Sequence, residues 1–278
     1  MAFCASCGAQ MTEGTAFCGS CGAPVGGAAA VVTPVAASTG IASNVAGLLA
    51  YVLGPITGTI FLLVEPYRQD KFVRFHAFQS ILYGIAAGVL FSIVGAVLSL
   101  ISMLTLGIGA LLYIPVYLLL SLLFFLYWLF LLYKAYNNER YMVPYIGTIA
   151  ASASDMPAGS SNLYGFLAYV LWFITGIILL MDDSTKQDKF VRFHAYQSIF
   201  FSVAMFVLWI FYWIFGLVFG VAVAITGGFF LHLLVFLVFR LVSLAMYGYY
   251  LFIMSKAYQN ELYKVPVIGD LAAKQAGV

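Results

Sequence analysis

Six long apolar stretches dominate the 278-residue chain. A helix needs about 20 apolar residues to cross the hydrocarbon core of a bilayer. Lipid offers backbone N–H and C=O groups no hydrogen-bond partner, so these stretches are expected to be helical. The sequence therefore predicts an all-α integral membrane protein with six transmembrane helices. The stretches cover approximately residues 43–64, 76–103, 110–134, 162–181, 194–226 and 229–256.

The composition excludes the main classes of water-soluble protein. Hydrophobic residues make up 64% of the chain, and charged residues only 8%, whereas a soluble domain carries about 25% charged residues. Such a chain cannot cover a soluble enzyme with polar groups, nor form the basic surface of a nucleic-acid-binding protein. The net charge of +2 is too small to attract a charged partner over long distances.

The chain also repeats itself. Residues 69–81 (QDKFVRFHAFQSI) and 187–199 (QDKFVRFHAYQSI) are identical at 12 of 13 positions. Similar matches precede and follow this motif in the same order, at 51–58 with 169–176 and at 134–147 with 256–269. The offset between the copies grows from 118 to 122 residues along the chain. The protein is therefore expected to contain two copies of one three-helix unit.

All four cysteines lie close to the N-terminus, at Cys4, Cys7, Cys18 and Cys21. Two CxxC pairs supply the four thiolates of a tetrahedral zinc shell. So short a segment has no core of its own and needs the metal in order to fold. We expect a zinc ribbon that holds one structural Zn²⁺ ion. The alternatives are two disulfides, a redox pair or a rubredoxin-type iron centre.

Zinc thiolates persist in a reducing compartment, which predicts a cytoplasmic N-terminus. A stretch rich in Gly, Ala and Pro follows the ribbon and predicts a flexible linker. A short polar stretch separates the two copies. The predicted division is zinc ribbon 1–23, linker 24–41, membrane repeat 42–147, inter-repeat linker 148–161, membrane repeat 162–270 and C-terminal tail 271–278.

The repeated motif places polar side chains on two faces of a helix. His76 and Gln79 share one face, which is expected to hydrogen-bond to other helices, within the bundle or across the repeat interface. The alternative is a polar path for a proton, a solute or a peptide. Arg74 lies on the other face and is expected to pair with Asp70 at the helix start, or to reach lipid phosphates. The counterparts in the second copy are Asp188, Arg192, His194 and Gln197.

One charge falls near the middle of the sixth apolar stretch. Arg240 occupies the position that Leu118 holds in the first copy, and His232 lies on nearly the same face of the helix. A charge at this depth is costly and usually functional. The expected partner is a helix-end carbonyl, a polar cavity, an anionic ligand or a loop carboxylate (Glu65 or Asp183). Snorkelling to the membrane surface is the alternative.

The number of apolar stretches per copy determines the expected topology. Three spans are an odd number, so the two copies should have opposite orientations in the membrane. Gly54 and Pro55 break the first stretch, which gives an alternative. If the first segment of each copy is re-entrant, every charged loop lies in the cytoplasm.

The motif FVRFHAxQS, preceded by a span that ends in ITG, resembles an uncharacterised bacterial membrane protein family. That family is distantly similar to the chloroplast inner-envelope import-channel subunit of the Tic translocon. The similarity covers approximately residues 45–147 and 163–269. It implies a helical protein of the bacterial plasma membrane and no established reaction. The Tic subunit differs by having one copy, four spans and Asn in place of His76 and His194.

The sequence contains no recognisable set of catalytic residues, so a non-enzymatic role is expected. We expect a multi-pass membrane scaffold whose zinc ribbon contacts a cytosolic protein. The alternative is a membrane conduit or transporter for a solute, a proton or a polypeptide. The lipid bilayer is the expected environment, no nucleic-acid partner is expected, and the sequence does not define the oligomeric state.

Overall fold

The computed structural model describes residues 2–3, 10–11 and 40–278. The chain divides into two compact units, Met1–Gly40 and Ile41–Val278. In the first unit, strand β1 (Ala2–Phe3) pairs antiparallel with β2 (Gln10–Met11). The four predicted zinc ligands and most of the predicted linker lie outside the described residues.

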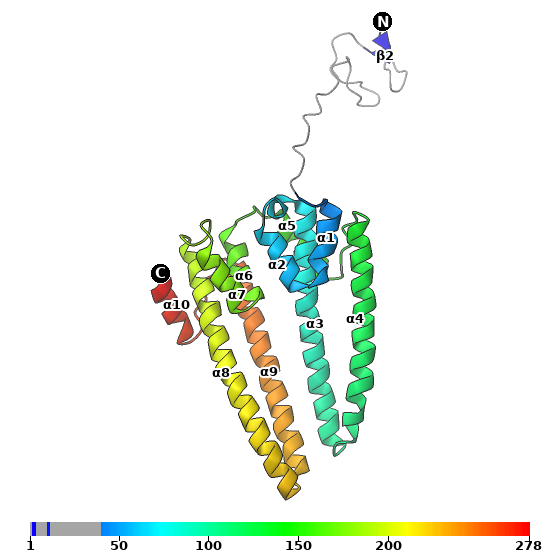
Figure 1. Ribbon diagram of the computed structural model, residues 1–278, viewed down its shortest axis with the longest axis vertical. Coiled ribbons are helices and arrows are strands. Elements are labelled where there is room, and N and C mark those ends of the chain that lie inside the picture. The colour runs from blue at the N-terminus through cyan, green and yellow to red at the C-terminus, as the bar shows by residue number, and fades with distance from the viewer. Residues whose placement is uncertain (1, 4–9, 12–39) are drawn as a thin grey trace. The chain divides into compact units, whose positions relative to one another are not determined.

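Four helices in the described part of the second unit are long and apolar enough to cross a membrane. They lie in a row in the order α8, α9, α3, α4, and the two copies meet where α9 packs against α3 (Figure 1). The short 3-10 helix η2 (Ile108–Leu112) precedes α4. The bounds are α3 Lys71–Leu104, α4 Tyr113–Tyr136, α8 Lys189–Thr226 and α9 Phe229–Tyr258.

The first apolar stretch of each copy forms a hairpin of two short helices and not one continuous helix of span length. The hydroxyl of Ser43, at the start of the hairpin, donates to Asp70 at the start of α3. At the tip, Pro55 packs against Gly84 of α3, only about 20 Å along that helix. The second helix then returns to the start of α3. The bounds are α1 Ser43–Val52, α2 Pro55–Leu63, α6 Ser161–Val170 and α7 Phe173–Met181.

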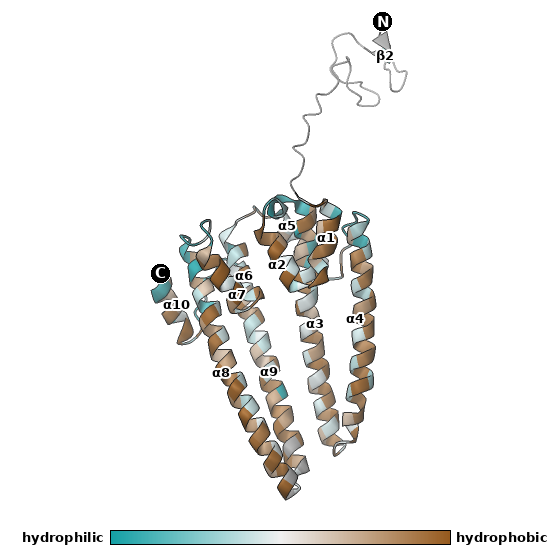
Figure 2. Cartoon of the chain, in the orientation of Figure 1, coloured by the Kyte–Doolittle hydropathy of each residue, from teal (hydrophilic) through white to brown (hydrophobic). Residues whose placement is uncertain are grey.

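The expected count of six spans is not confirmed: four helices of the described chain have the length of a span, and the first stretch of each copy is a hairpin of two short helices. The hairpins correct the expected inversion of the copies. Helices α3 and α8 both begin at the end where the hairpins lie, so both copies have the same orientation (Figure 1). Polar residues gather at the end where the hairpins lie, whereas the long helices are mostly apolar beyond it, with one hydrophilic turn midway along α9 (Figure 2).

Two further helices replace segments that the sequence assigned to a linker and a tail. Helix α5 (Ile146–Asp155) packs against α3, and α10 (Ile268–Ala276) packs against α8. Each buries a stripe of small residues at helical spacing, which allows a close approach to the long helix. The copies therefore extend beyond 147 and 270. The buried residues are Gly147, Ala150, Ala153 and Ser154 in α5, and Gly269, Ala272, Ala273 and Ala276 in α10.

We predict that cysteines introduced as Arg68→Cys and Lys186→Cys react with an impermeant thiol reagent from the same side of the membrane. The four native cysteines are replaced by serine for this test. Leu106→Cys and Gly227→Cys, at the opposite ends of the spans, should react only from the other side. Labelling of positions 68 and 186 from opposite sides would restore the inverted topology.

Candidate functional site

The repeated motif begins with an aspartate that starts the first long helix of each copy. The Asp70 carboxylate accepts hydrogen bonds from the backbone N–H groups of Phe72 and Val73, at 2.8 and 3.2 Å. Asp188 does the same at the start of α8. This confirms the predicted helix starts, since a carboxylate at this position satisfies otherwise unpaired N–H groups.

The motif arginines do not pair with these aspartates, which corrects the first expectation. Nη2 of Arg74 donates to the carbonyl of Ala153 at 3.2 Å, and Nη2 of Arg192 donates to that of Gln275 at 2.9 Å. Both carbonyls belong to the last turns of α5 and α10, where a cation interacts favourably with the helix dipole. Each arginine therefore fixes a short helix against a long one.

The histidine and the glutamine of each copy join a buried cluster with a tyrosine of the hairpin. Nε2 of Gln79 donates to the Tyr51 hydroxyl at 2.9 Å and to the carbonyl of Tyr141 at 3.0 Å. Oε1 of Gln79 accepts from the backbone N–H of Val143 at 3.1 Å. The Tyr51 hydroxyl lies 3.2 Å from Nδ1 of His76. One amide thus links the hairpin, α3 and the segment that follows α4.

The order of donors assigns the proton of the imidazole ring. The Tyr51 hydroxyl accepts from Gln79 and can donate onward to Nδ1 of His76, an arrangement in which the ring proton lies on Nε2. This nitrogen is buried and lies beside the backbone carbonyl of Glu139. The second copy repeats the arrangement with Tyr169, His194 and Gln197. Both clusters are internal to a copy and connect helices, so neither lies across the repeat interface.

The two copies contact each other through residues that differ from the residues at the equivalent positions of the opposite copy. The Tyr247 hydroxyl of α9 donates to the carbonyl of Ile85 at 3.3 Å, and a methyl group on Gly88 would lie 2.7 Å from this hydroxyl. A methyl group on Gly95 would lie 3.8 Å from Nη1 of Arg240. Gly88 therefore leaves room for Tyr247 of α9, whereas the room beside Gly95 is taken first by the Tyr117 hydroxyl of α4, 2.6 Å from such a methyl group, with Arg240 in ordinary contact.

The positions equivalent to these residues have diverged. In α8, Phe206 and Trp213 stand where α3 has Gly88 and Gly95, and in α4, Leu118 and Phe125 replace Arg240 and Tyr247. If α8 of one molecule approached α4 of another molecule in the same way, aromatic side chains would occupy the contact. The contact between the two copies is therefore asymmetric.

Arg240 lies at a cavity of about 620 Å³ in the second copy. The guanidinium packs over the Phe236 ring at 5.2 Å from its centroid, and Nε is buried without a hydrogen-bond partner in the described part of the chain. The side chain of His232 lies outside what the structure describes. The cavity walls, contributed by the α6–α7 turn, α8 and α9, include Trp172, Ser202, Trp209, Tyr212, Ser243 and Tyr247.

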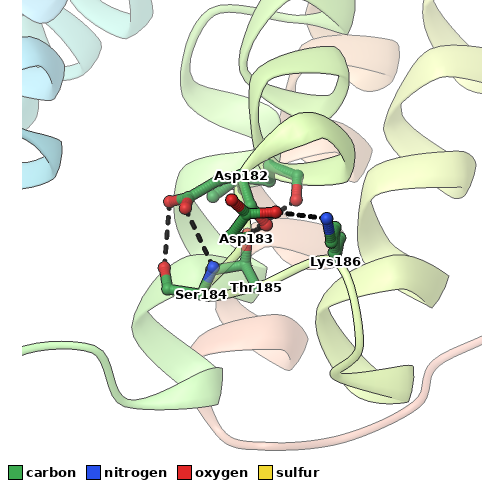
Figure 3. A network of polar contacts seen from close by, with 6 residues as sticks. Asp182, Asp183, Ser184, Thr185 and Lys186 are labelled. Atoms are coloured by element: carbon green, nitrogen blue, oxygen red, sulfur yellow. Dashed lines mark hydrogen bonds and ion pairs between the residues drawn. The ribbon is translucent and has the colours of Figure 1, made fainter.

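The loop carboxylates considered as partners of Arg240 have nearer partners. Asp183 pairs with Lys186, in a loop that Asp182 orders by accepting from the N–H and the hydroxyl of Ser184, both at 3.0 Å (Figure 3). The hydrogen bond from Lys186 lowers the pKa of Asp183 below its ordinary value. Glu65 likewise pairs with Arg68 in the first copy. Neither acid neutralises Arg240.

Trp172, which lines the cavity, has a backbone conformation that suits glycine. Its φ and ψ are 58° and −130°, and the equivalent Gly54 has nearly the same values, 56° and −122°. A residue with a Cβ atom is strained here, at a cost of about 1–3 kcal/mol. Sequence analysis did not single out this residue, although the repeat alignment places a tryptophan opposite a glycine at the hairpin break.

We predict that Gln79→Leu lowers the thermal unfolding midpoint in detergent. It leaves the Tyr141 carbonyl and the Val143 N–H buried without partners, at about 1–3 kcal/mol for each group. Gln69→Leu, at an exposed position, is the control and should change stability by less than about 0.5 kcal/mol. Equal midpoints for the two variants would contradict a structural role for the cluster.

We also predict that Trp172→Gly is more stable than Trp172→Ala by about 1 kcal/mol or more. Both variants lose the indole ring, but only glycine relieves the strained φ. The measurement compares their unfolding midpoints in the same detergent. An alanine variant as stable as the glycine variant would show that the backbone at this position is unstrained.

Comparison with known proteins identifies two parts of the chain. Residues 3–25 match the zinc-ribbon domain model. A UPF0132 membrane protein of Archaeoglobus fulgidus is 46% identical over 107 residues, 38% of this chain and 90% of the relative. Two UPF0132 membrane proteins of Methanocaldococcus jannaschii are 39% identical over 122 residues (42% and 94%) and 35% over 111 residues (40% and 69%). No solved structure matches.

These relatives are archaeal, so they do not support the expected restriction to a bacterial family. The similarity to the Tic subunit stays a prediction. Each match is about as long as one of the two copies. The extent and identity of these matches establish that the chain belongs to the UPF0132 membrane protein family.

Proposed function

We propose that this protein is a non-enzymatic membrane scaffold that presents a zinc ribbon to a soluble protein on one side of the bilayer. The observation that carries the proposal is the return of both hairpins to the end at which they enter. This return brings the charged loops, α5, α10 and the start of the membrane unit to a single side.

The distribution of basic residues supports a cytoplasmic location for that side. Each copy has three basic residues in and just after the loop that follows its hairpin, and the described turns at the opposite ends, 105–112 and 227–228, carry no charge. Basic residues are concentrated in cytoplasmic loops. The same location suits reduced thiolates. The six basic residues are Arg68, Lys71, Arg74, Lys186, Lys189 and Arg192.

The ribbon in this proposal binds one Zn²⁺ ion through Cys4, Cys7, Cys18 and Cys21. The match to a zinc-ribbon domain over residues 3–25 and the spacing of the two CxxC pairs support it. The ion supplies the folding free energy that so short a segment lacks. The folded ribbon then offers a compact surface to its partner, and the linker sets the distance from the membrane.

The geometry favours a scaffold over a conduit. Within the described residues, the motif side chains are engaged in hydrogen bonds inside each copy, and the four spans form an open row (Figure 1). A path for a solute or a polypeptide would need a polar lining that continues across the membrane. The conduit alternative rests on the polar His–Gln faces of the motif, on Arg240 and on the distant resemblance to the Tic subunit.

The test compares protein crosslinking in native membranes for the wild type and the double variant Cys4→Ser, Cys7→Ser. The double variant should lose bound zinc and its crosslinked soluble partner while remaining in the membrane. Arg240→Leu is the control and should keep both. Unchanged crosslinking without zinc would contradict the scaffold. Flux across liposomes above that of empty vesicles, reduced by Arg240→Leu, would favour the conduit.

A further inference from the structure

The cavity beside Arg240 has the chemistry of a ligand site. Its volume of about 620 Å³ lies in the range of small-molecule pockets, about 300–1,000 Å³. Aromatic and aliphatic side chains form most of its wall, and Arg240, Ser202 and Ser243 are among its polar groups. Nε of Arg240 and the hydroxyl oxygen of Ser202 are both buried without a partner in the described part of the chain.

The depth of Arg240 makes the missing partner significant. The residue lies 11 positions after Phe229, which begins α9, and so about 16 Å along the helix. In a hydrocarbon core of about 30 Å this is close to the midplane. A positive charge at that depth needs a counter-charge or a polar environment. Among the described residues no acidic side chain lines the cavity, and none forms an ion pair with Arg240.

The cavity walls reach the lipid-facing surface. Trp172, Leu208 and Trp209 line the cavity and are each 55% exposed. A molecule in the bilayer can therefore enter sideways and place an apolar chain against these side chains. Trp172 contributes a large aromatic side chain to this wall although its backbone conformation is strained. The equivalent residue of the first copy is Gly54.

We propose that the cavity binds an anionic amphiphile, a molecule with a carboxylate or phosphate head and an apolar chain. The head forms an ion pair with Arg240 and accepts a hydrogen bond from Ser202. The chain lies against the aromatic wall and extends into lipid. The first copy cannot form this site, because Leu118 replaces Arg240 and Gly84 replaces Ser202. The proposal is independent of the scaffold function.

The test uses the full chain in phosphatidylcholine nanodiscs at alkaline pH, where a fatty acid is ionised. Dibrominated stearic acid quenches tryptophans that it contacts, and Trp172 and Trp209 line the cavity. Its methyl ester enters the bilayer but carries no charge. The ester therefore measures the quenching caused by brominated chains that are dissolved in the bilayer and not bound at Arg240. The acid should quench wild-type fluorescence more strongly and saturably. Equal quenching by acid and ester would overturn the proposal.

Variants then test the role of the charge. Arg240→Leu should weaken binding of the acid about 10-fold or more, because a charge-assisted hydrogen bond is lost, whereas Arg240→Lys should keep most of it. Leu118→Ala, at the matching position of the first copy, is the control and should have no effect. Unchanged acid binding by Arg240→Leu would overturn the proposal. If Arg240→Leu misfolds, the comparison of acid and ester on the wild-type protein still tests the proposal.

A third probe identifies the head group. Brominated phosphatidic acid carries a phosphate in place of the carboxylate. Stronger saturable quenching by either anion than by the methyl ester supports the site, and the tighter of the two identifies its preferred head. Failure of both anions to exceed the ester would overturn it.

Discussion

In each copy, one buried glutamine hydrogen-bonds the hairpin to the long helix that follows it and to the segment after the second span. The rest of the membrane unit depends on this interaction. A hairpin that enters lipid and turns back must satisfy its own polar groups, because the hydrocarbon core supplies none. Gln79 and Gln197 each contact a hairpin tyrosine and two backbone groups of the segment after the second span. These contacts keep both ends of the hairpin on one side of the membrane.

Duplication followed by divergence explains how one unit gave two different halves. The internal contacts of each copy are nearly identical, down to the donors and acceptors of the Tyr–His–Gln clusters. The contact between copies is different, because Gly88 of the first copy accommodates the Tyr247 hydroxyl of the second copy. Arg240, Ser202 and Trp172 all stand where the first copy has an apolar residue or a glycine. The new chemistry is therefore concentrated in the second copy, at its border with the first.

Much of this arrangement was predictable from the sequence. The apolar stretches, the repeat, the aspartates that start the long helices and the inward His–Gln face all follow from local patterns. Hydropathy measures how apolar a segment is and not the direction in which it runs, so a hairpin and a span of equal length look alike. The break at Gly54 and Pro55 indicated the alternative, but only contacts with α3 decide between them.

Other features depend on contacts between distant residues. Helices α5 and α10 consist largely of Ala, Ser and Gly, which resemble a linker until a long helix covers their small faces. Arg74 lies one turn from Asp70, yet Ala153, 79 residues away, accepts its hydrogen bond. The cavity beside Arg240 needs walls from three separate segments. No local pattern predicts such pairings, because each depends on how the elements pack.

The most direct measurement of the central claim is the distance between spin labels at positions 41 and 64, with the four native cysteines replaced by serine. The backbone N–H of Ile41 donates to the Tyr67 hydroxyl at 2.7 Å, so both labels lie at one end of the hairpin. We predict a separation of about 20 Å or less, as for neighbouring helix ends. A separation of about 35 Å, the length of a continuous helix over these residues, would contradict the re-entrant hairpin.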